Sequence, residues 1–363
     1  MKIAAIETEW VSIPFHHGGP SSGFGATNWN KLDTLLVKVT TDDGIVGWGE
    51  AFGYNAIPAT RMAVERMVAP LAIGRDAGSI PTLMLELQKS LHNFGRYGQT
   101  LFALSGLDIA LWDIAAKAAG VPLHRLFGQA SPADVPAYAS LLRYGVPEVV
   151  RGHCAAAIEE GYRHIKLHER GVPSVAAARE GAGPDAAIMI DVNCPWTVQQ
   201  SMEMARAFAP YDILWLEEPV WPPENFGGLA EVRRAGPLAI AAGENACTVW
   251  DFEKMLASGA VTYAQPSVTK VGGITEFRKV TALCEASNVL LAPHSPYFGP
   301  GFLATIHLLV GTDQPVERYY GNLEADLYGG MTRTKGGRLA VPSGPGIGPD
   351  PDPEVIRRYR VQA

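Results

Sequence analysis

Short apolar runs alternate with longer amphipathic segments from residue 135 to residue 320. After a first run at residues 135–142, the apolar runs are HIKLH, AAIMIDVN, ILWLEEP, LAIAAGEN, VTYAQPSVTK, VLLAPHSP and PVERYY. Helical periodicity between them predicts crossover helices in GVPEVVRGHCAAAIEEGY, TVQQSMEMARAFAPY, NFGGLAEVRRAG, TVWDFEKMLASG and GITEFRKVTALCEASN. Strands that alternate with helices in this way are typical of a parallel sheet.

The number of these units favours a closed sheet. Seven or eight strand–helix units within about 190 residues close more naturally as a barrel than as an open sheet. A doubly wound open sheet is the alternative, and it usually carries a glycine-rich phosphate loop after its first strand. No such loop follows residues 135–142. We therefore predict an α/β barrel domain over residues 126–324.

The first third of the chain has strands first and helices after them. Strand-like alternation covers residues 2–14 and 34–51, and Asp43-Gly44 in the second stretch is a hairpin signal. Helical periodicity then follows at residues 58–71, 80–92 and 99–119. This order predicts an α+β domain over residues 1–125.

Two segments lie outside these patterns. The loop at residues 14–31 is rich in glycine and serine and contains His17 and Trp29. A loop of this length is usually either disordered or functional, so both a surface loop with aromatic anchors and a lid over a substrate fit it. The tail at residues 325–363 is rich in glycine and proline and then briefly helical. We expect the tail to pack back on the domain formed by residues 1–125.

The composition narrows the class of protein. The 363 residues carry a net charge of −7, and 47% of them are hydrophobic, which is typical of a globular protein with a large core. Nucleic acid is a poor partner for an acidic chain, because phosphate binding needs a basic face. We find no run of about 18 apolar residues that would span a membrane. The four cysteines lack CxxC spacing, which indicates buried or incidental thiols in a reducing compartment. We therefore expect a cytoplasmic protein, and for the reasons above we expect that it binds neither nucleic acid nor membrane.

Three carboxylates end successive predicted strands. Asp191, Glu217 and Glu244 are spaced by about one strand–helix unit, and a parallel barrel places strand ends on the same rim. Converging carboxylates repel one another unless a cation neutralises them, and oxygen ligands favour Mg²⁺, with Mn²⁺ as the alternative. Any one of these acids alone would be read as an ordinary loop residue. Glu218 competes with Glu217, but strand neighbours point to opposite sides, so only one of the two faces the mouth.

Basic side chains end two other predicted strands. Lys166 and His168 are two residues apart and therefore lie on the same side of their strand, whereas His294 ends a strand across the mouth. A lysine in such a site can have its pKa lowered, and a histidine needs no shift to titrate near neutral pH. A lone histidine is more often structural. Two basic groups on either side of a divalent ion, however, suit removal of the proton α to a carboxylate.

Taken together, these residues resemble the enolase superfamily, and within it the mandelate racemase/muconate lactonizing enzyme group. The resemblance covers nearly the whole chain and rests on ALSGLDIALWDIAAKAAGVPLHRLFG, a K-x-H pair, DVN, EEP, GEN, PSVTKVGG, PHSP and VPSGPGIG. It implies a modified (β/α)7β TIM barrel with an N-terminal α+β capping domain that the C-terminal tail completes. It also implies a homo-oligomer that binds Mg²⁺ through Asp191, Glu217 and Glu244, with catalysis by Lys166, His168 and His294.

Further residues are candidates for contact with a substrate. Glu317, in the eighth strand, matches a position that hydrogen-bonds the substrate carboxylate as an electrophile in mandelate racemase. The other candidates come from the sixth barrel strand and from the loop at residues 14–31: Ser267, Lys270, His17 and Trp29.

Two positions depart from the family pattern. His168 stands where the family often has a second lysine. Ser267 stands where the mandelate racemase group has an aspartate that orients the seventh-strand histidine, and where the muconate lactonizing group has a lysine. Serine cannot supply the negative charge of an aspartate. We therefore expect His294 to be a weaker base than the histidine of a His–Asp dyad, although it can still act as a general acid.

These features favour dehydration of a sugar acid through an enediolate. The Lys166/His168 side would take the α-proton, and His294 would assist loss of the β-hydroxyl. The polar loop with His16, Ser21, Ser22 and Asn28 suits a small polyhydroxylated carboxylate. A racemase or epimerase is the second hypothesis and a cycloisomerase the third. A binding protein on a degenerate barrel is disfavoured, because decay would not be expected to keep all three metal carboxylates.

Overall fold

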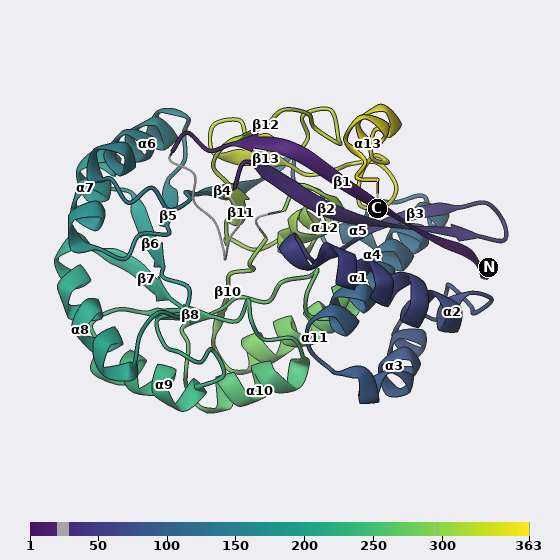
Figure 1. The fold of residues 1–363 in the computed structure, drawn as a ribbon, viewed down its shortest axis with the longest axis horizontal. Helices are drawn as coiled ribbons and strands as arrows, with labels where there is room; N and C mark the ends of the chain where they lie inside the picture. The colour runs from purple at the N-terminus through teal and green to yellow at the C-terminus, as the bar shows by residue number, and fades with distance from the viewer. Residues whose placement is uncertain (20–28, 296, 363) are drawn as a thin grey trace.

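Two β-sheets organise the computed structural model, which describes residues 1–19, 29–295 and 297–362 (Figure 1). The first is an antiparallel sheet of four strands, and its three long members are β1 (Ile3–His16), β2 (Lys31–Thr41) and β3 (Val46–Ala51). The chain turns between β2 and β3, where Gly44 has a φ of 89° and Thr41 N donates to Ile45 O over 3.0 Å. The hairpin predicted at Asp43-Gly44 is therefore confirmed, and it divides the stretch 34–51 into two strands.

The helices that follow cover this sheet. They are α1 (Ile57–Ala63), a π-helical turn (Val64–Val68), α2 (Ala69–Ala72), α3 (Ile80–Ser90) and α4 (Gln99–Ala118). These elements confirm the three predicted helical regions. Helix α4 lies so close to β3 that a Cβ on Gly49 would be 1.9 Å from the carbonyl oxygen of Gly106, and glycine at this position permits the approach.

The second sheet consists of parallel strands that follow one another around a curve. They are β4 (Asp134–Ser140), β5 (His164–Leu167), β6 (Ala187–Asp191), β7 (Ile213–Glu217), β8 (Ile240–Ala242), β9 (Tyr263–Ala264), β10 (Leu290–Leu291) and β11 (Val316–Tyr319). Strand β11 pairs with β4, so β10 and β11 lie at the two ends of the sheet. Ser295, after β10, bridges these ends by donating from N to Glu317 Oε2 over 3.1 Å. The predicted α/β fold class is confirmed.

Helices surround the curved sheet on its outer side. They are α6 (Pro147–Glu159), α7 (Val172–Ala182), α8 (Val198–Phe208), α9 (Phe226–Ala235), α10 (Val249–Ala257), α11 (Gly273–Ala286) and α12 (Pro300–Leu309). Figure 1 shows α6 to α10 as an arc around β5 to β8, with the N-terminal sheet and α1 to α4 on the other side. All five predicted crossover helices are present. Helices α7 and α12 were not predicted.

The tail returns to the first sheet. Strand β12 (Asn322–Leu323) pairs with the end of β1, and α13 (Pro353–Tyr359) precedes Val361, whose N donates to Trp10 O over 2.8 Å. Between them, β13 (Arg338–Ala340) pairs with β4, and the four-residue helix α5 (Leu123–Leu126) joins the first part of the chain to the second. Among the described residues, no helix is both long enough and apolar enough to cross a membrane.

Candidate active site

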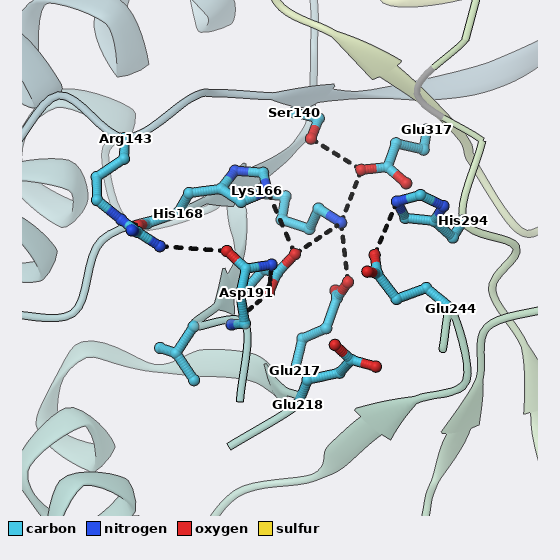
Figure 2. A network of polar contacts seen from close by, with 12 residues as sticks. Ser140, Arg143, Lys166, His168, Asp191, Glu217, Glu218, Glu244, His294 and Glu317 are labelled. Carbon is cyan, nitrogen blue, oxygen red and sulfur yellow. Dashed lines mark hydrogen bonds and ion pairs between the residues drawn. The ribbon is translucent and has the colours of Figure 1, made fainter. Parts of the chain in front are cut away.

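The three strand-end carboxylates meet at one point of the curved sheet (Figure 2). Asp191 is the last residue of β6 and is paired in register with Glu217, the last residue of β7. Glu244 follows β8 after Gly243, which has a φ of 138°, a backbone conformation that glycine adopts without strain. One oxygen from each of the three lies within 4.8 Å of the others. The spacing along the chain therefore brings these residues together as predicted, while their role as metal ligands stays a prediction.

Lys166 lies fully buried among these acids. Its Nζ is 2.9 Å from Glu217 Oε1, 2.7 Å from Glu317 Oε1 and 3.6 Å from Asp191 Oδ2. Burial alone would lower the pKa of Lys166, but Glu217 and Glu317 raise it well above its ordinary value. The carboxylates around the ammonium group thus act on its pKa in the direction opposite to the one considered from the sequence, which assumed a neighbouring cation or base.

Lys166 alone does not neutralise the carboxylates around it, because one ammonium group lies beside three acids. Burial raises the pKa of Glu217 well above its ordinary value, and Asp191 and Glu317 add to the rise, although Lys166 opposes it. Buried like charges of this kind are stabilised when a cation lies between them. The donors are carboxylate oxygens, which are the ligands that Mg²⁺ prefers. The residues present therefore fit a divalent cation.

Glu218 points away from Lys166 (Figure 2). Its oxygens accept from Asn245 Nδ2 over 2.8 and 3.0 Å, and from Cys194 Sγ over 3.4 Å. Burial, followed by the charges of Glu244 and Asp191, raises the pKa of Glu218 to about 8. Its left-handed backbone, with a φ of 45°, is a strained conformation of the kind found at functional sites. Glu217 and Glu218 thus face different surroundings, as strand alternation predicts.

His168 has one nitrogen committed to the backbone. Its Nδ1 is 2.5 Å from Leu141 O, and because a carbonyl can only accept, Nδ1 must carry a proton. The other nitrogen, Nε2, faces the carboxylates at 3.2 Å from Asp191 Oδ2. Arg143 Nε donates to the carbonyl oxygen of His168 over 2.7 Å and thereby supports this position. Nε2 is consequently the nitrogen that can take up a proton from a molecule in the site.

His294 lies on the opposite side of the carboxylates from His168 (Figure 2). Its Nε2 is 2.8 Å from Glu244 Oε2, and its Nδ1 is 3.2 Å from the hydroxyl of Tyr297. Burial alone would raise the pKa of Glu244, but His294 and Lys270 lower it to about 2. The two histidines therefore approach the carboxylate cluster from the ends of different strands, and each directs its Nε2 atom toward a carboxylate.

Glu317 is held as an anion. It accepts from Ser140 Oγ over 2.8 Å and from the backbone N of Ser295 over 3.1 Å, besides its ion pair with Lys166. Although burial would raise the pKa of Glu317, Lys166 and His294 lower it. A carboxyl that hydrogen-bonds a substrate carboxylate must carry a proton. The predicted electrophilic role therefore requires a proton that the observed surroundings do not favour.

Lys270 and Ser267 also lie at the site. Lys270 places Nζ 4.7 Å from the centre of the ring of Phe52, the residue that directly follows β3 of the first sheet. The Ser267 hydroxyl makes a short contact with the hydroxyl of Tyr297, and Tyr297 in turn contacts His294. Contact of Lys270 or Ser267 with a substrate stays a prediction.

The two candidates from the N-terminal loop occupy different places. Trp29 packs edge-on against Tyr319, with ring centres 5.1 Å apart. His17 is buried and stacks on Phe15, and burial followed by the charge of His153 lowers its pKa. Ser21, Ser22 and Asn28, which belong to the predicted lid, lie outside the described residues.

Several tyrosines at the site were missed in the sequence. Tyr319 hydrogen-bonds Tyr54 through their hydroxyls over 2.8 Å, and the Tyr138 ring lies 5.9 Å from Lys166 Nζ. Strand periodicity could have found Tyr319, because it follows Glu317 by two residues and shares its side of β11. Tyr54 begins a three-residue 3-10 helix and Tyr297 lies in a loop, and no periodicity marks either of them.

Two family models match most of the chain. Residues 21–128 match the mandelate racemase/muconate lactonizing enzyme N-terminal domain, and residues 149–355 match the enolase C-terminal domain-like family.

Curated relatives align over nearly their whole length. The chain is 32% identical to a 3,6-anhydro-α-L-galactonate cycloisomerase of Streptomyces coelicolor, with 99% of both chains covered. It is 30% identical to a D-galactarolactone cycloisomerase of Agrobacterium fabrum, again with 99% of both covered. An arabinonate dehydratase of Saccharolobus solfataricus is 28% identical, with 92% of both covered.

Solved structures show the same architecture. The crystal structure of a racemase from Streptomyces coelicolor A3(2) with bound magnesium superimposes with a TM-score of 0.86 at 30% identity, and covers 99% of this chain and 100% of that one.

Proposed function

Because the chain belongs to the mandelate racemase/muconate lactonizing enzyme group of the enolase superfamily, we propose that it is a Mg²⁺-dependent enzyme that dehydrates a sugar acid. The observation that carries the proposal is the placement of His168 and His294 on opposite sides of the buried carboxylates. A dehydratase among the relatives supports the reaction, and the magnesium in a related structure supports the metal. The cytoplasmic location remains part of the proposal.

Asp191, Glu217 and Glu244 would hold the cation, with Mn²⁺ as the alternative to Mg²⁺. Bound there, the cation would supply positive charge that stabilises the negative charge developing on the substrate carboxylate. Lys166 adds a second positive charge beside the same acids. In this proposal Lys166, whose Nζ is held by Glu217 and Glu317, binds and orients a carboxylate, and the base is the histidine on its side.

His168 is the base in this proposal. Its Nδ1 keeps a proton through the bond to Leu141, so Nε2 is free to accept the α-proton. The electrons of the C–H bond pass to the α-carbon and the carboxylate, which gives the enediolate.

His294 is the acid. As the enediolate collapses, the bond from the β-carbon to its hydroxyl breaks, and the leaving oxygen takes a proton from Nε2 of His294 to depart as water. The enol that remains tautomerises to a 2-keto acid. His168 gains one proton from the substrate and His294 gives one to the leaving water, so the reaction balances without a redox partner.

A cycloisomerase is the second candidate, and two relatives of this name, each covering 99% of the chain, favour it. The same pair of histidines could break or form a ring C–O bond in place of losing a hydroxyl. A racemase or epimerase would instead use His168 and His294 as bases on the two faces of the α-carbon. It is less favoured, because the partner of His294 Nδ1 is the hydroxyl of Tyr297 and not the carboxylate of a His–Asp dyad.

The test is a screen of the purified protein with Mg²⁺ and an acid-sugar library in deuterated water. Apart from the deuterium that exchange introduces, dehydration lowers the product mass by one water and cycloisomerisation leaves it unchanged, and both reactions remove the α-proton. We expect His168→Ala to lose exchange. We expect His294→Asn to keep exchange and to lose product by about 10²-fold or more, the usual contribution of a general acid.

His92→Asn is the matched control, because His92 is exposed and bonds the carbonyl of Lys89 on the surface. Loss of exchange in His294→Asn, with exchange retained in both His168→Ala and Lys166→Ala, would reverse the assignment and make His294 the base.

A further inference from the structure

The hydroxyl of Tyr297 occupies the space between Ser267 and His294. It makes a short contact with Ser267 Oγ and lies 3.2 Å from His294 Nδ1. Ser267 is fully buried and Tyr297 is 6% exposed, so water has little access to this contact. The serine that stands in place of a dyad aspartate therefore reaches the histidine through a second side chain.

A third hydroxyl lies beside these two. Thr269 Oγ1 is 3.4 Å from Ser267 Oγ, and Thr269 also hydrogen-bonds Tyr297, so three hydroxyl groups cluster next to the imidazole. The Tyr297 ring is held edge-on by Phe52, with centres 6.1 Å apart and an interplanar angle of 71°. Burial raises the pKa of Tyr297 well above its ordinary value, so this hydroxyl carries no charge.

We propose that Tyr297 is the positioning residue for His294, with Ser267 holding the tyrosine hydroxyl in place. The bond at Nδ1 fixes the imidazole so that Nε2 faces the carboxylate cluster. The proposal rests on the proposed function only for the statement that His294 delivers a proton. The contact between Tyr297 and His294 stands independently of the substrate.

A hydroxyl partner differs from a carboxylate in what it can do. It accepts from a protonated Nδ1 or donates to an unprotonated one, whereas a carboxylate only accepts. Tyr297 can thus hold the ring in the same orientation before and after proton delivery without a negative charge beside it. This arrangement suits proton delivery to a leaving oxygen on one face, which elimination and ring opening require.

The test compares Tyr297→Phe with the parent in two measurements. In protein labelled with ¹⁵N-histidine, we expect the ring nitrogen signals of His294, assigned with His294→Asn, to shift when the hydroxyl is removed. With the acid-sugar substrate and Mg²⁺, we expect kcat to fall by about 10- to 100-fold, as for loss of other supporting hydrogen bonds, with KM little changed. Exchange of the α-proton should persist, because His168 is untouched.

Two further variants complete the experiment. Ser267→Ala leaves Tyr297 its hydroxyl but removes the partner that holds it, so we expect a smaller change of the same ring signals. Tyr162→Phe is the control, since it removes a hydroxyl that bonds Thr334 over 2.7 Å outside the site, and it should change neither measurement.

The outcomes are separable. Ring signals of His294 that are identical in the parent and in Tyr297→Phe would overturn the proposal whatever the activity. Shifted signals with unchanged kcat would overturn the role in proton delivery. If no acid sugar is exchanged or converted by the parent protein, the proposed function fails, while the nuclear magnetic resonance comparison still decides whether Tyr297 positions His294.

Discussion

At the residue scale, the charge balance around Lys166 is the feature with the largest energetic consequence. One ammonium group contacts Asp191, Glu217 and Glu317, and the exposure of its side chain is 0%. Removing one member of a buried ion pair typically costs about 3–5 kcal/mol, because the partner charge stays buried and unpaired.

We therefore predict that Lys166→Met lowers the free energy of unfolding by about 3–5 kcal/mol without Mg²⁺. The variant should then gain more stability from Mg²⁺ than the parent does, because the cation no longer competes with an ammonium group for the same carboxylates. Urea unfolding of both proteins with and without Mg²⁺ measures the two gains.

Lys38→Met is the control, since the Lys38 ammonium pairs with Glu7 at the surface and surface pairs contribute about 1 kcal/mol or less. A Mg²⁺ gain in Lys166→Met that is equal to or smaller than that of the parent would contradict the expectation that these acids hold the cation.

Residues at or just after the ends of strands could be predicted from their spacing, and Tyr297, which lies farther along its loop, could not. Asp191, Glu217 and Lys166 lie at or next to the ends of strands, so an even spacing along the chain places them on one rim. Tyr297 follows a strand by several residues, and its hydroxyl reaches Ser267 through a loop conformation that no period describes. The partner that replaces the dyad aspartate is visible only in three dimensions.

At the scale of elements, β3 and α12 are joined by a buried acid. Glu50, on β3, accepts from the backbone N of Gly301 in the first turn of α12 over 2.9 Å. Burial raises the pKa of Glu50 to about 8, although this hydrogen bond opposes the rise. The folded protein therefore keeps a proton that the unfolded chain releases near pH 4.5.

We predict that this proton makes stability fall as pH rises. Between pH 4.5 and about 8 the folded state binds more protons at Glu50 than the unfolded state. The contribution is therefore complete at low pH and is lost as pH rises, by at most about 1.4 kcal/mol for each pH unit. Glutamine cannot titrate, so the free energy of unfolding of Glu50→Gln should fall less steeply with rising pH than that of the parent.

Denaturant unfolding at several pH values between 5 and 8 measures how the free energy of unfolding changes with pH. These values lie between the ordinary pKa of Glu50 and its pKa in the folded protein. Glu253→Gln, on the exposed side of α10, is the matched control and should keep the slope of the parent. A slope that Glu50→Gln leaves intact would assign the pH dependence to other groups.

Element prediction succeeded where the polar and apolar positions contrast. Helices α8 and α10 have clear polar faces and N-terminal capping boxes, and both were predicted. Helix α12 is buried at nine of its ten residues, so its sequence is apolar on every side and lacks the helical period. Helix α7 is rich in alanine, which contrasts little with either face.

At the scale of the whole molecule, the assembly state is still a prediction from the family. Large aromatic side chains remain on the surface of the single chain, including Phe94 at 67%, Trp221 at 66% and Trp250 at 59% exposure. Singly exposed apolar side chains are normal on a protein surface, so the expectation rests on the family alone. We expect a homo-oligomer in solution.

Light scattering coupled to gel filtration measures the mass directly. A mass near 38.9 kDa, that of one chain, would contradict the expectation. A multiple of that mass that persists on dilution would support it.

The division into a capping domain and a barrel also stays a prediction in its boundaries. The order of elements predicted both architectures. Strands that precede helices are typical of an α+β domain, and strands that alternate with helices are typical of a parallel sheet. The path of the tail could not be predicted in detail, since glycine- and proline-rich segments have no period. Its β12 and β13 are short and pair with strands far away in the sequence.

The pairing of β12 with β1 has a consequence for the order in which the protein is made. Leu323, the partner of Phe15, emerges from the ribosome more than three hundred residues after it. Val361, which bonds Trp10, emerges later still. This edge of the first sheet thus waits, unpaired, while the segments between them are made, and it is covered only when β12 and the segment around Val361 follow.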